Sequence, residues 1–228
     1  MRKQTALIAA AVIFVLLASC TGPKGPAGPS GANVLSMTFQ DGISPFPSYI
    51  GVEDTYADSL NASTNYIGSN LLYVGYNTAN MTVDRAFIRF DMYPLIPSNA
   101  VVVKAYLTLY AEGASASFPV IRAYRVTHSW LQPMLTWITT GLIPWTTHGG
   151  DYDPAAVSDA VTYANGNNAM TFTLNNSLVE SWMNDPATNY GVVLIAQNEH
   201  ISDGDEYFAS SQNSDYFRPK LTVYYTLP

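Results

Sequence analysis

Apolar and polar residues alternate with a period of two along much of the chain. In the segment 101–110, one face would carry Val101, Val103, Ala105, Leu107 and Leu109, whereas the other would carry Lys104, Tyr106, Thr108 and Tyr110. Similar patterns occur at 34–39, 71–74, 85–90, 119–126, 170–174, 190–196 and 221–225. Because successive side chains of a strand point to opposite faces, this alternation predicts half-buried β-strands.

Turn signals separate these segments. The dipeptides that favour tight turns are Asp41-Gly42, Asn165-Gly166 and Asp203-Gly204. One short helix is predicted where Ser177 and Glu180 have the spacing of a capping box, with an apolar side formed by Leu178, Val179 and Trp182. Many strands and little helix predict an all-β fold, a β-sandwich or jelly roll with one short helix, as a single domain over residues 34–228.

The N-terminus has the pattern of a secretion signal. Arg2 and Lys3 precede an apolar run of 13 residues, 6–18, which as a helix would span about 20 Å of a hydrocarbon core that is about 30 Å thick. This length is typical of a signal peptide and too short for a membrane span. The run ends Leu17-Ala18-Ser19-Cys20, which resembles the bacterial lipobox. That resemblance implies removal of residues 1–19 and acylation of Cys20; the alternative is a plain signal peptide with a chance cysteine.

Cysteine usage agrees with a lipid anchor. Cys20 is the only cysteine in 228 residues, so no intramolecular disulfide, cysteine nucleophile or cysteine-ligated metal is expected. Acyl chains on Cys20 would hold the protein on a membrane essentially permanently. Because Thr21 rather than Asp follows the cysteine, resemblance to the Gram-negative pattern implies the outer membrane and display outside the cytoplasm.

Residues 20–33 form a spacer behind the anchor. It contains four consecutive Gly-X-Y triplets, which begin at Gly22, Gly25, Gly28 and Gly31. Glycine at every third position is what a collagen triple helix requires, but four triplets are few. We expect an extended stalk, and the alternative is a collagen-like stem that assembles a homotrimer.

The charge of the chain limits its partners. Without Arg2 and Lys3, the 10 basic residues fall to eight against 17 acidic ones, a net charge of −9. Nucleic acids and anionic membrane surfaces attract the opposite charge, so neither is expected as a partner of the domain.

An ordered set of short motifs resembles a known family. The motifs are Asp54-Thr55-Tyr56, Asn65-Tyr66-Ile67-Gly68, Leu72-Tyr73-Val74-Gly75, Arg85-Ala86-Phe87-Ile88-Arg89-Phe90-Asp91, Ala105-Tyr106-Leu107-Thr108-Leu109-Tyr110, Gly149-Gly150-Asp151, Asn189-Tyr190-Gly191, Phe208-Ala209-Ser210-Ser211 and Arg218-Pro219-Lys220-Leu221-Thr222-Val223. Their order resembles the DNRLRE domain, also called the disaggregatase-related repeat or carbohydrate-binding module family 96. The resemblance implies a β-sandwich on secreted or cell-surface proteins, with some members that bind alginate. Because basic residues are few and scattered here, a neutral or mixed glycan fits better than an acidic one.

Catalytic motifs are lacking in the sequence. It contains neither a Gly-x-Ser-x-Gly elbow nor a His-Glu-x-x-His zinc pair, and His128, His148 and His200 are far apart. A glycosidase-like carboxylate pair stays open, because acidic residues are numerous. No cofactor is expected, although Asp203-Gly204-Asp205-Glu206 has the oxygen donors for a structural calcium ion; the alternative is an acidic surface turn.

One polar loop is the candidate binding site. Trp130, Trp137 and Trp182 are expected in the core or at a sheet edge, whereas Trp145 and Tyr152 flank a flexible segment that contains His148 and Asp151. Aromatic rings stack on sugars, and Asp and His bond their hydroxyls, so Trp145, His148, Asp151 and Tyr152 are the predicted carbohydrate-binding residues. The sequence leaves three functions open: a lipid-anchored, non-catalytic polysaccharide-binding or adhesion module, a structural surface protein, and a polysaccharide hydrolase or lyase.

Overall fold

The computed structural model describes residues 33–114, 119–162, 168–199 and 204–228. The segment Ala32–Pro228 forms one compact unit. The predicted signal peptide, Cys20 and the Gly-X-Y spacer lie outside the described residues. None of the described helices is long and apolar enough to cross a membrane.

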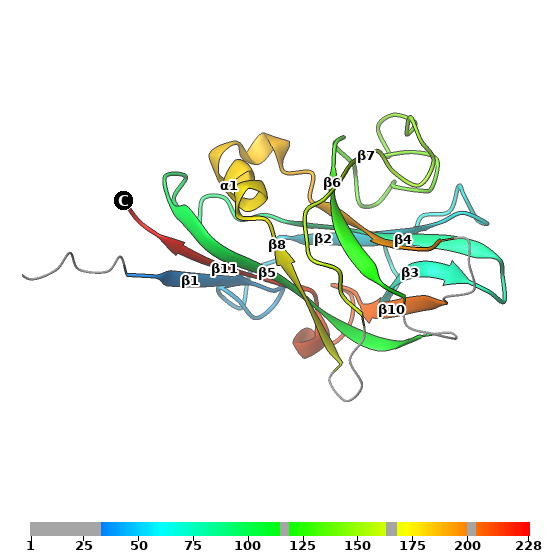
Figure 1. Cartoon of the computed structure of the whole chain (residues 1–228), viewed down its shortest axis with the longest axis horizontal. Coiled ribbons are helices and arrows are strands. Elements are labelled where there is room, and N and C mark those ends of the chain that lie inside the picture. Colours follow the sequence, from blue (N-terminus) through cyan, green and yellow to red (C-terminus); the bar gives the residue numbers. More distant parts are fainter. Residues whose placement is uncertain (1–32, 115–118, 163–167, 200–203) are drawn as a thin grey trace, which may run out of the picture. The chain divides into compact units, whose positions relative to one another are not determined.

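Within the described residues, eleven strands, one α-helix and two 3-10 turns make up the fold (Figure 1). In chain order the elements are β1 Leu35–Phe39, β2 Val52–Asp58, β3 Leu71–Asn77, β4 Thr82–Phe90, β5 Val101–Ala114, β6 Ile121–Val126, β7 Tyr152–Ala156, β8 Ala169–Leu174, α1 Asn176–Asn184, η1 Pro186–Thr188, β9 Val192–Ala196, β10 Asp205–Ala209, η2 Asp215–Phe217 and β11 Lys220–Thr226. The predicted all-β sandwich with one short helix is confirmed.

Two layers of antiparallel strands face each other across the main core. The first layer has the order β1-β11-β5-β8, and the second consists of β4 with β2 on one edge and β9, β6 and β7 beyond the other. The 14-residue strand β5 continues past the first layer to pair with β10, which pairs with β3, and β3 pairs with β4. The two layers are therefore linked at one end by a single hydrogen-bonded path.

The main core lies between the layers. Phe39, Leu107 and Phe172 come from the first layer and meet Ile88 and Leu194 from the second, all nearly inaccessible to water. Each of these side chains alternates along its strand with residues of the outer face, as the period-two pattern predicts. Burial of this apolar surface holds the layers together.

Helix α1 packs against β5 with Leu178, Val179, Trp182 and Met183 buried, so its predicted apolar side is confirmed. The predicted capping box is wrong. Asn175 is the N-cap residue without a side-chain bond, and Ser177 lies inside the helix. Glu180 has a different partner, because its Oε1 accepts a hydrogen bond from the Val102 N–H at 2.9 Å and ties the helix to β5.

Three strands are additional to the predicted segments: β2, β7 and β10. Strand β10 occupies part of the expected acidic turn. Its Asp205 and Glu206 point to opposite faces, because they are neighbours in a strand, and a structural calcium ion at this segment stays a prediction. Asp203 lies outside the described residues.

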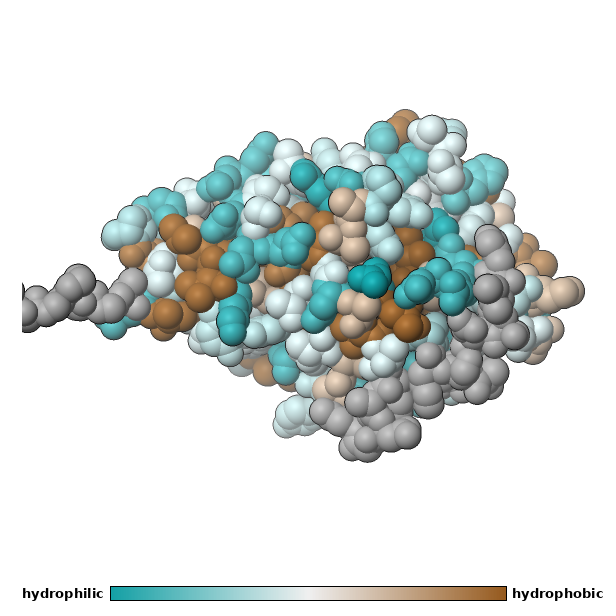
Figure 2. Space-filling model, in the orientation of Figure 1, coloured by the Kyte–Doolittle hydropathy of each residue, from teal (hydrophilic) through white to brown (hydrophobic). Residues whose placement is uncertain are grey.

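Exposed apolar residues gather where β1, the start of β5 and the C-terminus meet, the end that is brown at the left of Figure 2. They include Val34, Leu35, Val101, Val103 and Leu227, each at least 40% exposed. Smaller hydrophobic areas also lie near the middle of this face and at its right edge, among hydrophilic and intermediate residues (Figure 2).

Candidate functional site

The connection between β6 and β7, residues 127–151, folds over the outer face of the second layer and buries a second, smaller core. Phe87 of β4 and Val193 and Ile195 of β9 supply the floor, and Trp130 and Trp145 of the connection cover it. The Trp145 ring stacks on Phe87 with centroids 5.6 Å apart, and Trp130 meets Phe87 edge-on at 6.1 Å. Both indole N–H groups are satisfied, since Trp130 donates to the Tyr190 carbonyl at 2.8 Å and Trp145 to that of Thr136 at 3.0 Å.

Trp145 is therefore an internal residue. It is only 4% exposed, and the Phe87 ring lies against it, so this burial contradicts the predicted stacking contact with a sugar. The physical reason is that Phe87 leaves a flat apolar surface on the outside of the sheet, and the loop needs an aromatic anchor to cover it. Trp145 also anchors the segment that follows it, which the sequence predicted to be flexible.

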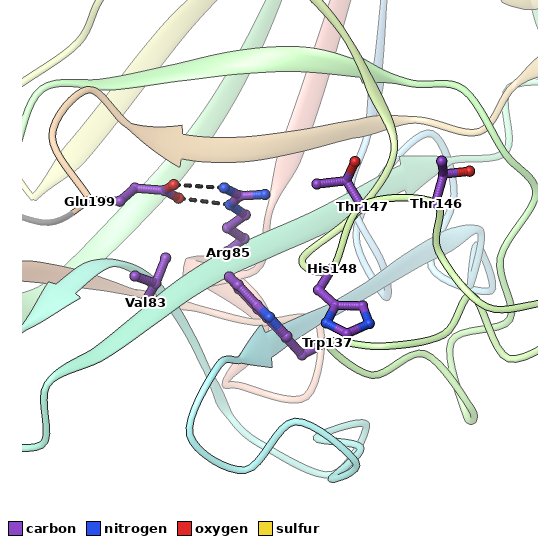
Figure 3. A pocket seen from close by; sticks show the side chains of 7 residues that line it. All are labelled: Val83, Arg85, Trp137, Thr146, Thr147, His148 and Glu199. Atoms are coloured by element: carbon purple, nitrogen blue, oxygen red, sulfur yellow. Dashed lines mark hydrogen bonds and ion pairs between the residues drawn. The ribbon is translucent and has the colours of Figure 1, made fainter.

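An open pocket of about 520 Å³ lies beside the second core (Figure 3). It is lined by Val83 and Arg85 of β4, Trp137, Thr146, Thr147 and His148 of the β6–β7 connection, and Glu199. Trp137 packs against the second core but is only half-buried, so it combines the predicted packing role with an accessible surface.

Arg85 is the central charged residue of this pocket. Its guanidinium carbon lies 5.2 Å from the centre of the Trp137 ring and 5.5 Å from that of Tyr152, which is cation–π distance from each ring. Its Nε and Nη2 donate to the two carboxylate oxygens of Glu199 at 2.7 and 2.6 Å, and its Nη1 donates to the Gly149 carbonyl at 3.1 Å. Figure 3 shows the paired bonds between the arginine and the glutamate.

This ion pair is fixed in place. The side chains of Arg85 and Glu199 are each 11% exposed. Burial alone would lower the pKa of Arg85, but the hydrogen bonds and negative charge of Glu199 outweigh burial and raise it, so the guanidinium stays charged. Three of its five N–H groups are used, which leaves two without a partner within the described residues.

Two adjoining pockets of about 340 Å³ each extend the surface around Tyr152. One is lined by Asp151 and Tyr152, the other by Tyr124, Tyr152 and Glu199 among others. The Tyr124 and Tyr152 rings are tilted against each other with centroids 5.3 Å apart. Aromatic rings and hydrogen-bonding groups thus follow one another over the outer face of β4, β9, β6 and β7.

Asp151 shapes the loop that borders these pockets. Its carboxylate accepts hydrogen bonds from the backbone N–H groups of Thr146 and Thr147, both at 2.8 Å, and lies 3.5 Å from the His128 ring nitrogen. Burial would raise the pKa of Asp151, but these hydrogen bonds outweigh burial and lower it. Asp151 is thus ionised at neutral pH and engaged by its own loop.

Two glycines allow the loop to approach the sheet closely. Gly149 and Gly150 have positive φ angles of 86° and 109°. A Cβ atom would lie 2.7 Å from the Trp137 ring at Gly149 and 2.7 Å from the Phe87 ring at Gly150. Only glycine combines this backbone conformation with this proximity.

The structure brings three of the four predicted site residues to this surface. His148 and Tyr152 line pockets, Asp151 does so while it orders the loop, and Trp145 lies beneath them. That these residues bind carbohydrate stays a prediction. Sequence reasoning missed the roles of Arg85, Trp137 and Glu199; the only signal was that Arg85 flanks Phe87 in a predicted strand.

No cluster of metal-ligating side chains is found among the described residues. They contain no group of three or more His, Cys, Asp or Glu side chains placed to hold a metal ion. The pocket around Arg85 offers one guanidinium, one carboxylate and hydroxyl groups instead.

Comparison with known proteins identifies the family. The family model of carbohydrate-binding module family 96 matches residues 46–225, which covers nearly all the described strands. A search of curated proteins gave no match. The chain belongs to carbohydrate-binding module family 96, and the resemblance noted in its sequence motifs is confirmed.

Proposed function

We propose that this protein is a lipid-anchored, non-catalytic module that binds polysaccharide at the pocket around Arg85. The observation that carries the proposal is that the Arg85 guanidinium lies within cation–π distance of both Trp137 and Tyr152 while Glu199 holds it in place. Family membership indicates carbohydrate as the class of ligand, and the side chains of Trp137, Arg85 and Tyr152 mark the surface at which it would bind.

The group formed by Trp137, Arg85 and Tyr152 has the properties that sugar recognition needs. Trp137 and Tyr152 are half-buried, so each is anchored and still presents apolar surface to a ligand. The remaining N–H groups of Arg85 and the hydroxyls of Thr146 and Thr147 border the same pocket. Because the groups are already ordered, binding costs little side-chain entropy.

The carboxylates of this surface support a binding role rather than hydrolysis. A glycosidase needs one carboxyl group that keeps a proton and a second that is free to attack or to activate water. Here Glu199 is paired with Arg85, and Asp151 holds two backbone N–H groups and has a lowered pKa. Asp151, with its lowered pKa, is therefore not suited to donate a proton at neutral pH, and Glu199 is not free to attack, because both of its carboxylate oxygens accept hydrogen bonds from Arg85.

Attachment through Cys20 is the second half of the proposal. The lipobox-like sequence and the lone cysteine support acylation, and the Gly-X-Y spacer would separate the domain from an outer-membrane surface. Cys20→Ala should move the protein from the membrane fraction to the soluble fraction and stop incorporation of labelled palmitate. A mutant that stays in the membrane fraction, with no label in the wild-type chain, would contradict the anchor.

Trp137→Ala tests the site. Loss of one stacking aromatic ring from a nucleic-acid site costs about 1–3 kcal/mol, and a similar loss here would weaken polysaccharide binding about 5- to 150-fold. Affinity electrophoresis of the full chain in gels that contain polysaccharide measures this change, with Tyr224→Ala on the other layer as the matched control. Equal binding by Trp137→Ala and wild type would refute the site, and new reducing ends in a mixture of protein and polymer would refute the non-catalytic role.

A further inference from the structure

A second pocket lies on the other face of β4, where β2, β3 and β4 meet. Its volume is about 210 Å³, and its lining residues come from these strands and from the loops that join them. Thr82 and Asp84 line this pocket, whereas Val83 and Arg85 line the first. Because neighbouring residues of a strand point to opposite faces, the two pockets are separated by the thickness of the sheet.

A row of four tyrosines borders this second pocket. The ring of Tyr66 stacks on Tyr56 with centroids 4.1 Å apart and planes 17° apart, Tyr56 meets Tyr73 at 5.1 Å, and Tyr73 meets Tyr207 at 5.4 Å. All four are half-buried. Tyr56 and Tyr73 line the pocket itself, and Tyr66 extends the aromatic surface at its rim.

Hydrogen-bonding groups surround the aromatic surface. Asp58 accepts hydrogen bonds from the Asn61 amide at 2.7 Å and the Tyr66 hydroxyl at 3.1 Å, so the loop after β2 is ordered around it. Asn61, Asn77, Asn80 and Thr82 add amide and hydroxyl groups to the lining. Paired amides and carboxylates are suited to the neighbouring hydroxyls of a sugar, which donate and accept at once.

Asp84 is a buried acid in the wall of this pocket. It is only 5% exposed and lies directly opposite Asp58 in the β2–β4 pairing. Across β3, Gly75 pairs with both Asp84 and Asp205, so three carboxyl groups stand in one cross-strand row. Like charges in such a row are destabilising, and a fold retains them at a cost to its stability. Burial, followed by the charges of Asp58 and Asp205, raises the pKa of Asp84 to about 8, which leaves it a proton to donate at neutral pH.

We propose that this pocket is a second carbohydrate-binding site, selective for neutral, hydroxyl-rich sugar units. The tyrosine row would stack on the apolar face of the ring, while Asp58, Asp84 and the asparagines bond its hydroxyls. An acidic sugar is disfavoured, because no lysine or arginine is among the described lining residues and the carboxylates of Asp58 and Asp205, which also raise the pKa of Asp84, would repel its charge. One module would then hold two polysaccharide segments on opposite faces of β4.

Affinity electrophoresis of the full chain tests this proposal. The gels contain either hydroxyethylcellulose, a neutral polymer, or polygalacturonate, an acidic one. The neutral polymer should retard the wild-type chain, also in the presence of EDTA, and Tyr66→Ala should bind it about tenfold more weakly. Asn61→Ala, a change at an exposed residue of the rim, should also weaken binding and serves if Tyr66→Ala does not fold. Tyr224→Ala should bind like wild type.

The outcomes separate the two sites. If Tyr66→Ala and Asn61→Ala bind the neutral polymer as the wild type does, the second site is refuted, although loss of binding in Trp137→Ala would still support the first. Retardation by polygalacturonate alone, or binding that EDTA abolishes, would also refute the second site. If neither polymer retards the wild-type chain, the neutral-sugar assignment is wrong.

Discussion

The two outer faces of the sandwich differ in what covers them. On the first layer, β1, β11, β5 and β8 present Thr38, Thr222, Tyr106 and Thr173 side by side in register, all at least partly accessible to water. On the second layer, Phe87, Val193 and Ile195 point outward and lie beneath the loop 127–151. The first face is polar enough to remain open, whereas the second requires a covering loop to remove apolar surface from water.

This difference shows why the first pocket lies where it does. The cover over Phe87 is made by Trp130 and Trp145, and the pocket opens at its margin, where Trp137 reaches Arg85. The loop that buries the apolar sheet face is thus ordered by this packing, and it lies beside the charged residues Arg85 and Glu199. The open face, in contrast, is held by hydroxyl and ring contacts such as Thr38 with Thr222 at 3.1 Å and Tyr106 with Tyr224 at 6.0 Å.

Trp145→Ala should break the covered face and give the largest effect. Removal of a buried tryptophan from a core costs about 3–5 kcal/mol of unfolding free energy, because apolar contact is lost and a cavity is left. Urea unfolding of the full chain measures the loss. Trp137→Ala, at the half-buried margin of the same loop, is the matched control and should lose much less. Equal losses would mean that the loop is not anchored through Trp145.

A change of pH should test the interior instead of the two faces. Burial raises the pKa of Asp54 to about 7, of Asp84 to about 8 and of Glu206 to about 7, whereas such groups have pKa values near 4 in an unfolded chain. Folding therefore favours the protonated acids, and their contribution to stability is lost as the pH rises through about 7 to 8. The melting temperature should be higher at pH 6 than at pH 9.

Glu206→Gln should reduce this dependence on pH. Glu206 is fully buried, and its carboxyl oxygens have no hydrogen-bond partner within the described residues. The amide cannot ionise, so the difference in melting temperature between pH 6 and pH 9 should shrink. The part of the Glu206 shift that lies above pH 6 is roughly one pKa unit, which corresponds to about 1.4 kcal/mol of unfolding free energy. An unchanged difference would show that Glu206 does not titrate in this range. Glu112→Gln, at an exposed position of β5, is the control.

Tyr224→Ala should give the smallest effect and sharpen the contrast between the faces. Tyr224 is 37% exposed and touches Tyr106 edge-on, a cross-strand pair of a kind that contributes about 0.2–1 kcal/mol. The urea midpoint for unfolding of the Tyr224→Ala variant should therefore differ only slightly from that of the wild type. A loss as large as that of Trp145→Ala would mean that the open face carries a packing role that its exposure conceals.

Most of the strands predicted from the sequence alternate between polar and apolar residues, whereas two of the three missed strands, β2 and β10, carry acids in the core. β11 alternates along Lys220–Thr226 and was predicted. β2 was missed, because Asp54 occupies an inward position, where the Ser211 N–H and hydroxyl bind it at 2.7 and 2.8 Å. β10 was missed for a similar reason, since Asp205 and Glu206 resemble a turn.

The covered face also had a signal in the sequence. In β9, Val192–Ala196, all five residues are apolar and buried, so this strand departs from alternation. A continuous apolar run indicates burial on both faces, and thus a cover over the outer one. The ion pair of the first pocket had no signal in the sequence, because Arg85 and Glu199 are 114 residues apart and only the fold brings them together.

Strand β4 lines both pockets, and this restricts which changes to its sequence the fold can accept. Thr82 and Asp84 serve one pocket, and Val83 and Arg85 serve the other. Substitutions can retune either site alone. Deletion or insertion of a single residue in β4, however, would exchange every side chain between the two faces, turning Arg85 toward the acids and Asp84 toward the tryptophan. The length of β4 is therefore constrained by two pockets at once, so this strand can vary by replacement of residues in place but not by a change of length.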